Sequence, residues 1–213
     1  TAQSLMVRPE HFVQTSERAF HEQFNIYPVD ATRTAIAVRV MHEYPADLTM
    51  VYLWGIDPTQ HYFWKYFQPE HWTGAPIEPE SLGLNRDRIA QYYRDTDAFV
   101  GRLVHDLGPR DTVILVSDHG AGPVAVADPA KPTVSGDHRI EGIIIAAGQH
   151  VRPGTASAAP GLLDVAPTVL HLLGLPAGED MPGHVITEML DPAFLEPHPV
   201  RRVTPWETGR RAV

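Results

Sequence analysis

The sequence predicts an α/β fold in which a mainly parallel β-sheet is flanked by helices. Short apolar runs alternate with segments whose apolar residues recur at helical spacing, in the order helix, strand, helix, strand, strand, helix. The polar residues that could carry chemistry follow these apolar runs, and an open α/β sheet places its sites beyond the carboxyl ends of its strands. Since a sheet normally has about five or six strands, we expect this one, with three predicted strands, to be incomplete.

The first firm element is an amphipathic helix over residues 31–43. Asp30 is a good N-cap for it, and Pro45 prevents its continuation. The apolar run 48–54 follows, and its length and composition are typical of a buried parallel strand. We therefore expect the first strand of the sheet at 48–54.

The middle of the chain predicts two helices separated by an irregular segment. A short helix would begin near Pro58, and the stretch 61–84 is rich in aromatic residues and proline. The next helix is long and amphipathic, with Asn85 as its expected cap and Gly108 as its expected stop. The aromatic residues 62–67 could line a pocket for a leaving group, but ordinary packing beneath a site is the favoured interpretation.

The last part of the chain supplies two further strands and a final helix. The strand 112–116 leads directly into the turn 117–120. A loop at 136–138 precedes the third strand, expected at 140–147. The final helix spans 164–173 and is closed by a glycine and a proline.

Composition limits what kind of protein this is. The 213 residues are 43% hydrophobic and 20% charged, which is typical of a globular domain with a core. No apolar run approaches the roughly 20 residues that cross a bilayer, so we expect a soluble chain of unspecified location. The formal charge of -9 argues against binding to nucleic-acid backbones. Because the chain has no cysteine and 12 histidines, any metal must be held by imidazole and carboxylate groups.

Three groups of potential metal ligands stand at the expected strand ends. They are Asp57 with His61, Asp118 with His119, and His138. Each group alone is weak evidence, because such residues more often form surface pairs, Asx turns or ordinary surface histidines. Asp57 and His61 would lie one helical turn apart, and the glycine after His119 permits an irregular turn. Together these residues indicate a site for divalent ions such as zinc.

These motifs resemble those of the type I phosphodiesterase/nucleotide pyrophosphatase branch of the alkaline phosphatase superfamily. The resemblance covers roughly residues 30–190 and rests on four stretches: VYLWGIDPTQHYFW at 51–64, VILVSDHG at 113–120, GDHRIEGIIIAAG at 136–148 and LDVAPTVLHLLGLPAGEDMPG at 163–183. It implies an alkaline-phosphatase-like fold. Residues 1–195 would then be the C-terminal portion of a catalytic domain, and residues 196–213 a surface tail.

The resemblance assigns the ligands to two divalent ions, with zinc expected and manganese or iron as alternatives. Asp57, His61 and His138 resemble the ligands of one ion. Asp118 and His119 resemble two ligands of the other ion.

The chain departs from the family at the nucleophile. In the family a second Asp and a Ser or Thr nucleophile come from an N-terminal half, and neither has a counterpart before Asp57. We therefore expect no catalytic nucleophile in this chain. It would lie N-terminal to Thr1, in a missing N-terminal half or a partner chain.

The function implied by the resemblance is metal-dependent hydrolysis of small phosphate esters, of the phosphodiester or pyrophosphate type, through a phospho-enzyme intermediate. The alternatives are a phosphomonoesterase, sulfatase, phosphonate hydrolase or metal-dependent phosphoglycerate mutase, and an inactive metal-binding fragment. The nucleophile and its neighbours distinguish these branches. His71 and His184 are the candidates for contact with substrate, on the basis of their loop positions near the motifs.

Overall fold

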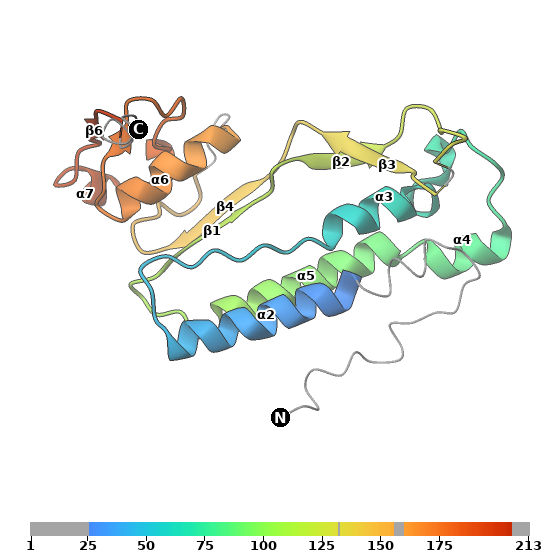
Figure 1. Ribbon diagram of the computed structural model, residues 1–213, viewed down its shortest axis with the longest axis horizontal. Coiled ribbons are helices and arrows are strands. Elements are labelled where there is room, and N and C mark those ends of the chain that lie inside the picture. The colour runs from blue at the N-terminus through green and yellow to red at the C-terminus, as the bar shows by residue number, and fades with distance from the viewer. Residues whose placement is uncertain (1–25, 132, 156–159, 206–213) are drawn as a thin grey trace, which may run out of the picture. The chain divides into compact units, whose positions relative to one another are not determined.

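The computed structural model describes residues 26–131, 133–155 and 160–205 (Figure 1). The chain divides into two compact units. The first comprises Thr1–Asp106 and His119–Glu141, and the second comprises Leu107–Asp118 and Gly142–Val213. The α/β class is confirmed, as a mixture of helices with small sheets.

Three helices dominate the first unit, and α5 packs against both of the others. They are α2 (Ile26–Glu43), α3 (Ile56–Phe67) and α5 (Arg88–Val104). A short 3-10 helix, η3 (Pro69–His71), and helix α4 (Pro79–Asn85) connect α3 to α5. A hairpin of β2 (Gly120–Pro123) and β3 (Gly136–Arg139) pairs antiparallel and contacts α3.

The core of the first unit is built from the aromatic segment of α3. Phe63, Trp64 and Tyr66 are buried together with Ile89 of α5. Burying a large apolar side chain contributes about 1.5–3 kcal/mol. The aromatic run therefore forms packing beneath the hairpin, as the favoured interpretation expected.

The second unit contains one two-stranded antiparallel sheet and a group of short elements. Strand β1 (Thr112–Val116) pairs with β4 (Ile144–Gly148). The remaining elements are η4 (Leu162–Asp164), α6 (Val165–Leu172), β5 (Ala177–Gly178), η5 (Thr187–Met189), α7 (Pro192–Leu195) and β6 (Arg202–Val203). Gly174, with a φ of 73°, follows α6 as the expected helix stop.

The mainly parallel sheet is absent from the described residues. The two longer strand pairs are antiparallel, and only the two-residue strands β5 and β6 pair in parallel. A parallel pair needs a crossover connection, usually a helix. Between β1 and β4 the described chain forms the β2–β3 hairpin instead of a helix, so β4 returns antiparallel.

The expected strand at 48–54 does not form, since the described residues include no strand there. Leu48, Met50 and Tyr52 are exposed, with Met50 at 86%. An apolar run becomes a strand only when another strand pairs with it. The third predicted strand is shorter than expected, because residues 140–143 lie outside β4.

Two predicted helix caps are wrong. Asp30 lies inside α2, and its carboxylate accepts hydrogen bonds from a distant segment instead of capping its own helix. Asn85 is the last residue of α4, while α5 begins at Arg88 and ends at Val104, before Gly108.

The described part of the expected tail is held by hydrogen bonds. Arg201 donates to the carbonyl of Gly174 at 2.7 Å, and Arg202 donates to the carbonyl of Met181 at 3.0 Å. Residues 206–213 lie outside the described part of the chain, and the domain boundary at 195 stays a prediction.

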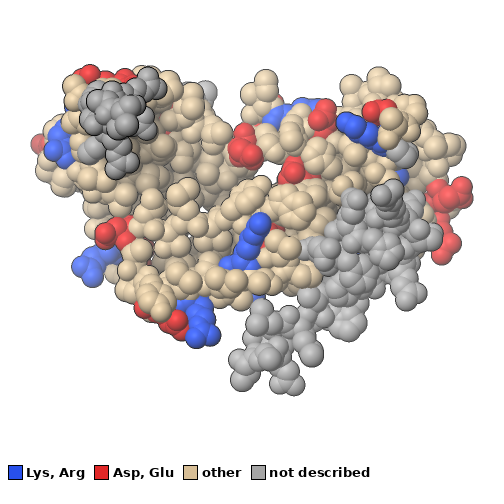
Figure 2. Space-filling view, in the orientation of Figure 1, with Lys and Arg blue, Asp and Glu red and all other residues tan. Residues whose placement is uncertain are grey.

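Two surface properties bear on the function. Nowhere in the described chain is there a helix whose length and apolar character would suffice to cross a bilayer. On the face shown in Figure 2, the described Lys and Arg side chains are scattered among Asp, Glu and uncharged areas without a continuous basic patch.

Candidate metal centre

Helix α3 presents the first two candidate ligands. Asp57 stands in its first turn, where a carboxylate is favoured by the helix dipole. His61 follows one turn later, and its Nε2 lies 3.3 Å from Oδ1 of Asp57. Pro58, also in the first turn, is suited to this position because it lacks an N–H. The predicted pairing on one helix face is therefore present.

The β2–β3 hairpin brings His138 to this helix. The backbone N–H of Ser135 donates to the carbonyl of His61 at 2.7 Å, so β3 begins in direct contact with α3. Gly136 allows this approach, since a Cβ there would lie 2.3 Å from the carbonyl oxygen of Gln60. His138, two residues later, is thereby positioned beside the helix.

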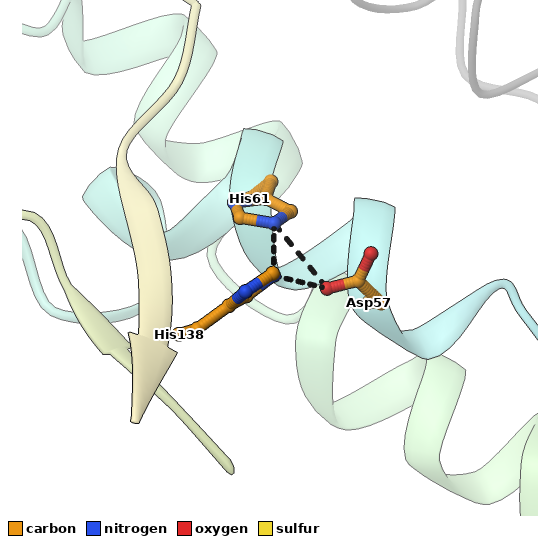
Figure 3. Close-up of side chains that lie close together, drawn as sticks. All are labelled: Asp57, His61 and His138. Atoms are coloured by element: carbon orange, nitrogen blue, oxygen red, sulfur yellow. Dashed lines mark hydrogen bonds and ion pairs between the residues drawn. The ribbon is translucent and has the colours of Figure 1, made fainter. Parts of the chain in front are cut away.

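Asp57, His61 and His138 converge on one point (Figure 3). The two Nε2 atoms are 2.9 Å apart, and Nε2 of His138 lies 3.2 Å from Oδ1 of Asp57. Ligands bound at about 2.1 Å in a tetrahedral site are about 3.4 Å apart. The donor set and its spacing therefore fit a single divalent ion.

Backbone carbonyls orient the imidazoles of the centre. Nδ1 of His61 lies 2.7 Å from the carbonyl oxygen of Gly136. Because a carbonyl only accepts, Nδ1 donates, and the neutral ring keeps a lone pair on Nε2. The same holds for His119, whose Nδ1 lies 2.9 Å from the carbonyl oxygen of Gly120.

His119 joins the same cluster. Its ring stacks on that of His138 with centroids 3.7 Å apart, and its Nε2 lies 3.7 Å from Oδ1 of Asp57. Three imidazoles thus surround one carboxylate oxygen. Asp118 belongs to the second unit, and its expected part in the second metal site stays a prediction.

The centre is partly open to solvent. The side chains of Asp57 and His61 are 31% and 26% exposed, and that of His138 is 52% exposed. A metal bound there could therefore keep a coordination position for water or substrate, as catalytic sites do.

Sequence reasoning identified these side chains but missed the backbone groups that orient them. Gly120, directly after His119, was the available signal for one of these carbonyls, whereas Gly136 lies far from His61 in the sequence and gave none. Of the substrate candidates, His71 is exposed in η3 beside Glu70, and His184 is exposed in the second unit near Asp164. Their contact with substrate stays a prediction.

Comparison with known proteins supports the motif assignment. The family model described as type I phosphodiesterase / nucleotide pyrophosphatase matches residues 7–142, which include all five expected ligands. The chain is 29% identical over 127 residues to a 2,3-bisphosphoglycerate-independent phosphoglycerate mutase of Rippkaea orientalis. That match covers 55% of this chain and 23% of the mutase, so the chain spans about a quarter of that relative. No solved structure matches the chain significantly.

Proposed function

Because the chain belongs to the type I phosphodiesterase/nucleotide pyrophosphatase family, we propose that it hydrolyses phosphate esters, of the diester or pyrophosphate type, at a metal centre. The ligands are Asp57, His61 and His138. The observation that carries the proposal is the convergence of their ligating atoms, all within 4.8 Å of one another. Two imidazoles and one carboxylate form a donor set found in catalytic zinc sites.

The residues of the centre have distinct roles. A bound divalent ion supplies Lewis acidity toward a phosphoryl oxygen. Asp57 contributes the negative charge that retains a dication, while His61 and His138 contribute imidazole nitrogen donors, and the Gly136 carbonyl fixes the tautomer of His61. The half-exposed His138 leaves the outer side accessible to an anionic substrate. The local positive charge thus offsets the repulsion expected from a chain of net charge -9.

A second ion at Asp118 and His119 is part of the proposal, as a weaker site. Two protein ligands rarely hold zinc, for which three or four are usual. His119 is close enough to the first cluster to contact an ion bound beside it.

The nucleophile is proposed to come from elsewhere than the described centre. Thr59 of α3 and Ser135, which directly precedes β3, carry aliphatic hydroxyls, but both residues are buried and bonded to backbone. Thr59 Oγ1 donates to the carbonyl of Gly55 at 2.7 Å, and Ser135 Oγ donates to that of His61 at 3.2 Å. Each residue is only 1% exposed. We propose that a covalent phospho-enzyme step uses a Ser or Thr from an N-terminal portion or a partner chain.

The metal centre is tested by titrating the chain with zinc and with manganese. We expect one tightly bound ion, which is lost in His61→Asn and retained in the control variant His42→Asn. His42 is a suitable control because its imidazole pairs with Asp106 on the surface of the same unit. Failure of the unmodified chain to bind either ion would contradict the proposal. So would unchanged binding by His61→Asn.

The reaction class is tested with para-nitrophenyl phosphate, bis-para-nitrophenyl phosphate and para-nitrophenyl sulfate. We expect the chain alone to hydrolyse none of them at a family-like rate with excess zinc or manganese. Family-like turnover that is abolished by His61→Ala would show that this chain contains its own nucleophile. When the portion that bears the nucleophile is added to the chain, a preference for the monoester or the sulfate over the diester would favour the corresponding alternative branch.

A further inference from the structure

The carboxylate of Asp30 is buried beside the N-terminus of α3, the helix that carries Asp57 and His61. Asp30, in α2, is completely buried. Its two oxygens accept hydrogen bonds from the backbone N–H of Trp54 at 3.0 Å and of Gly55 at 2.7 Å. The hydroxyl of Tyr92, in α5, donates to the same carboxylate at 2.9 Å. Three helices of the first unit thus meet at one charged group.

Burial of this carboxylate is costly unless it is fully hydrogen-bonded. Three donors satisfy it, and hydrogen bonds to a charged acceptor are roughly twice as strong as neutral ones. Its charge also lies beside the N-terminus of α3, where the helix dipole favours an anion. Gly55, the N-cap of α3, provides no side-chain cap, and its backbone N–H, which no residue of α3 accepts, donates to Asp30 of another helix.

The surroundings of Asp30 are shaped to bring the three helices together. A Cβ on Gly55 would lie 1.8 Å from the Tyr92 hydroxyl oxygen, so only glycine permits this approach. Burial raises the pKa of Tyr92 far above its usual range, and the Asp30 charge raises it further. The hydroxyl therefore remains a donor at any working pH.

We propose that Asp30, held by Tyr92, is a positioning residue for the metal centre. Asp57 follows Gly55 by two residues and His61 follows one turn later. A shift of the helix start therefore moves Asp57, in the first turn, relative to His61 and His138, which the contact between the hairpin and His61 holds together. This inference rests on the proposed metal site. A purely structural Asp30 would affect the stability of the fold and leave the affinity for metal unchanged.

The test compares zinc affinity in Asp30→Asn and Tyr92→Phe with that of the unmodified 213-residue chain, well below the unfolding temperature. We expect both variants to bind zinc about tenfold more weakly, as is typical when groups that orient ligands are removed. The matched control is Thr34→Val. Thr34 is equally buried, one turn from Asp30 in α2, and its hydroxyl donates only within that helix. It should lose stability and keep the affinity of the unmodified chain.

Two readouts keep the outcomes distinct. Unchanged zinc affinity in Tyr92→Phe, or an equal loss in Thr34→Val, overturns the positioning role, and this holds even if Asp30→Asn fails to fold. If the unmodified chain binds neither zinc nor manganese, the proposed function fails. The positioning role is then decided without metal by the nuclear Overhauser effect between the Cβ protons of Asp57 and the ring protons of His138, whose side chains approach to 3.2 Å between Oδ1 and Nε2. An effect equally strong in Tyr92→Phe overturns it, and a weakened one supports it.

Discussion

At the scale of single residues, the metal centre depends on which nitrogen of each histidine is available. The carbonyl of Gly136 accepts from Nδ1 of His61 and the carbonyl of Gly120 from Nδ1 of His119. These contacts leave both Nε2 atoms directed toward Asp57, at 3.3 and 3.7 Å from its Oδ1. A local backbone group thus determines the donor atom that each ring offers to an ion.

Metal binding should weaken in acid, because protons compete with the cation for the imidazole nitrogens. We expect zinc affinity to fall by roughly tenfold or more between about pH 8 and about pH 6. Calorimetric titration at several pH values, with correction for buffer protonation, measures this and the number of protons released. An affinity independent of pH over this range would exclude His61 and His138 as ligands.

His171 is a buried histidine whose protonation should destabilise the fold. Burial lowers its pKa from the ordinary 6.5, and His198 and Arg201 lower it further through repulsion. The unfolded chain therefore binds more protons than the native chain when the pH lies between the lowered value and 6.5. The stability that depends on neutral His171 is complete above the unfolded pKa and is lost as pH falls through the folded pKa.

The variant His171→Leu should remove this pH-dependent contribution. Nε2 of His171 has no hydrogen-bond partner among the described residues. Leucine should therefore also raise the free energy of unfolding at neutral pH, by about 1 kcal/mol. Urea unfolding at neutral and mildly acidic pH measures both effects. If the free energy of unfolding of His171→Leu depends on pH as steeply as that of the unmodified chain, other groups cause the acid sensitivity.

At the scale of secondary-structure elements, the centre is a contact between one helix and one hairpin. Ser135, the residue directly before β3, donates hydrogen bonds from its backbone N–H and its hydroxyl to the carbonyl of His61 in α3. The spacing between Asp57 and His61 was predictable because a helix repeats every 3.6 residues. That His138 joins this pair was predicted from the family resemblance, whereas the docking of its hairpin on α3 was not predicted, because it depends on contacts between segments far apart in sequence.

Gly136→Ala tests this contact between elements. The added Cβ would meet the carbonyl oxygen of Gln60 at 2.3 Å and Cα of His61 at 3.3 Å, and neither backbone atom can move easily. We expect β3 to be displaced from α3, with a loss of about 1–3 kcal/mol in unfolding free energy and a clear loss of zinc affinity. Gly101→Ala is the control, since a Cβ there meets nothing within 4 Å. Equal zinc affinity in Gly136→Ala would show that close docking of β3 is unnecessary.

At the scale of the whole molecule, the small sheet of the second unit exposes apolar side chains. In the sheet, Ile145 is 56% and Val116 is 39% exposed, and Ile143, directly before β4, is 55% exposed. An isolated pair of strands is marginally stable, and exposed strand edges favour association with other chains. We propose that an N-terminal portion or a partner chain covers this surface.

The chain alone should therefore self-associate as its concentration rises, and Ile145→Lys should reduce this association. Val126→Lys is the matched control, since Val126 is 77% exposed in a loop of the first unit. Light scattering coupled to size-exclusion chromatography measures the mass of each variant. A monomeric unmodified chain at high concentration, or equal effects of the two substitutions, would contradict this assignment.

The metal content of the whole chain distinguishes one complete site from two. We expect at most one tightly bound ion per chain, because Asp118 and His119 are too few to hold another. Elemental analysis after dialysis against a weak chelator gives this number. Two tightly bound ions would reveal a ligand that neither the motifs nor the described cluster includes.

The sequence by itself determined the family, the strand β1 and the order of the metal ligands. These features depend on residue type and on spacing within one element, as with Asp57 and His61 on α3. Only the tertiary structure decided the antiparallel pairing of β1 with β4, the place of His119 beside His138, and the partners of Asp30. In each case the outcome depends on hydrogen bonds and packing between segments far apart in the chain. Asp30 shows the reason most clearly: its carboxylate could satisfy its own helix or another segment, and burial against Trp54, Gly55 and Tyr92 selected the latter.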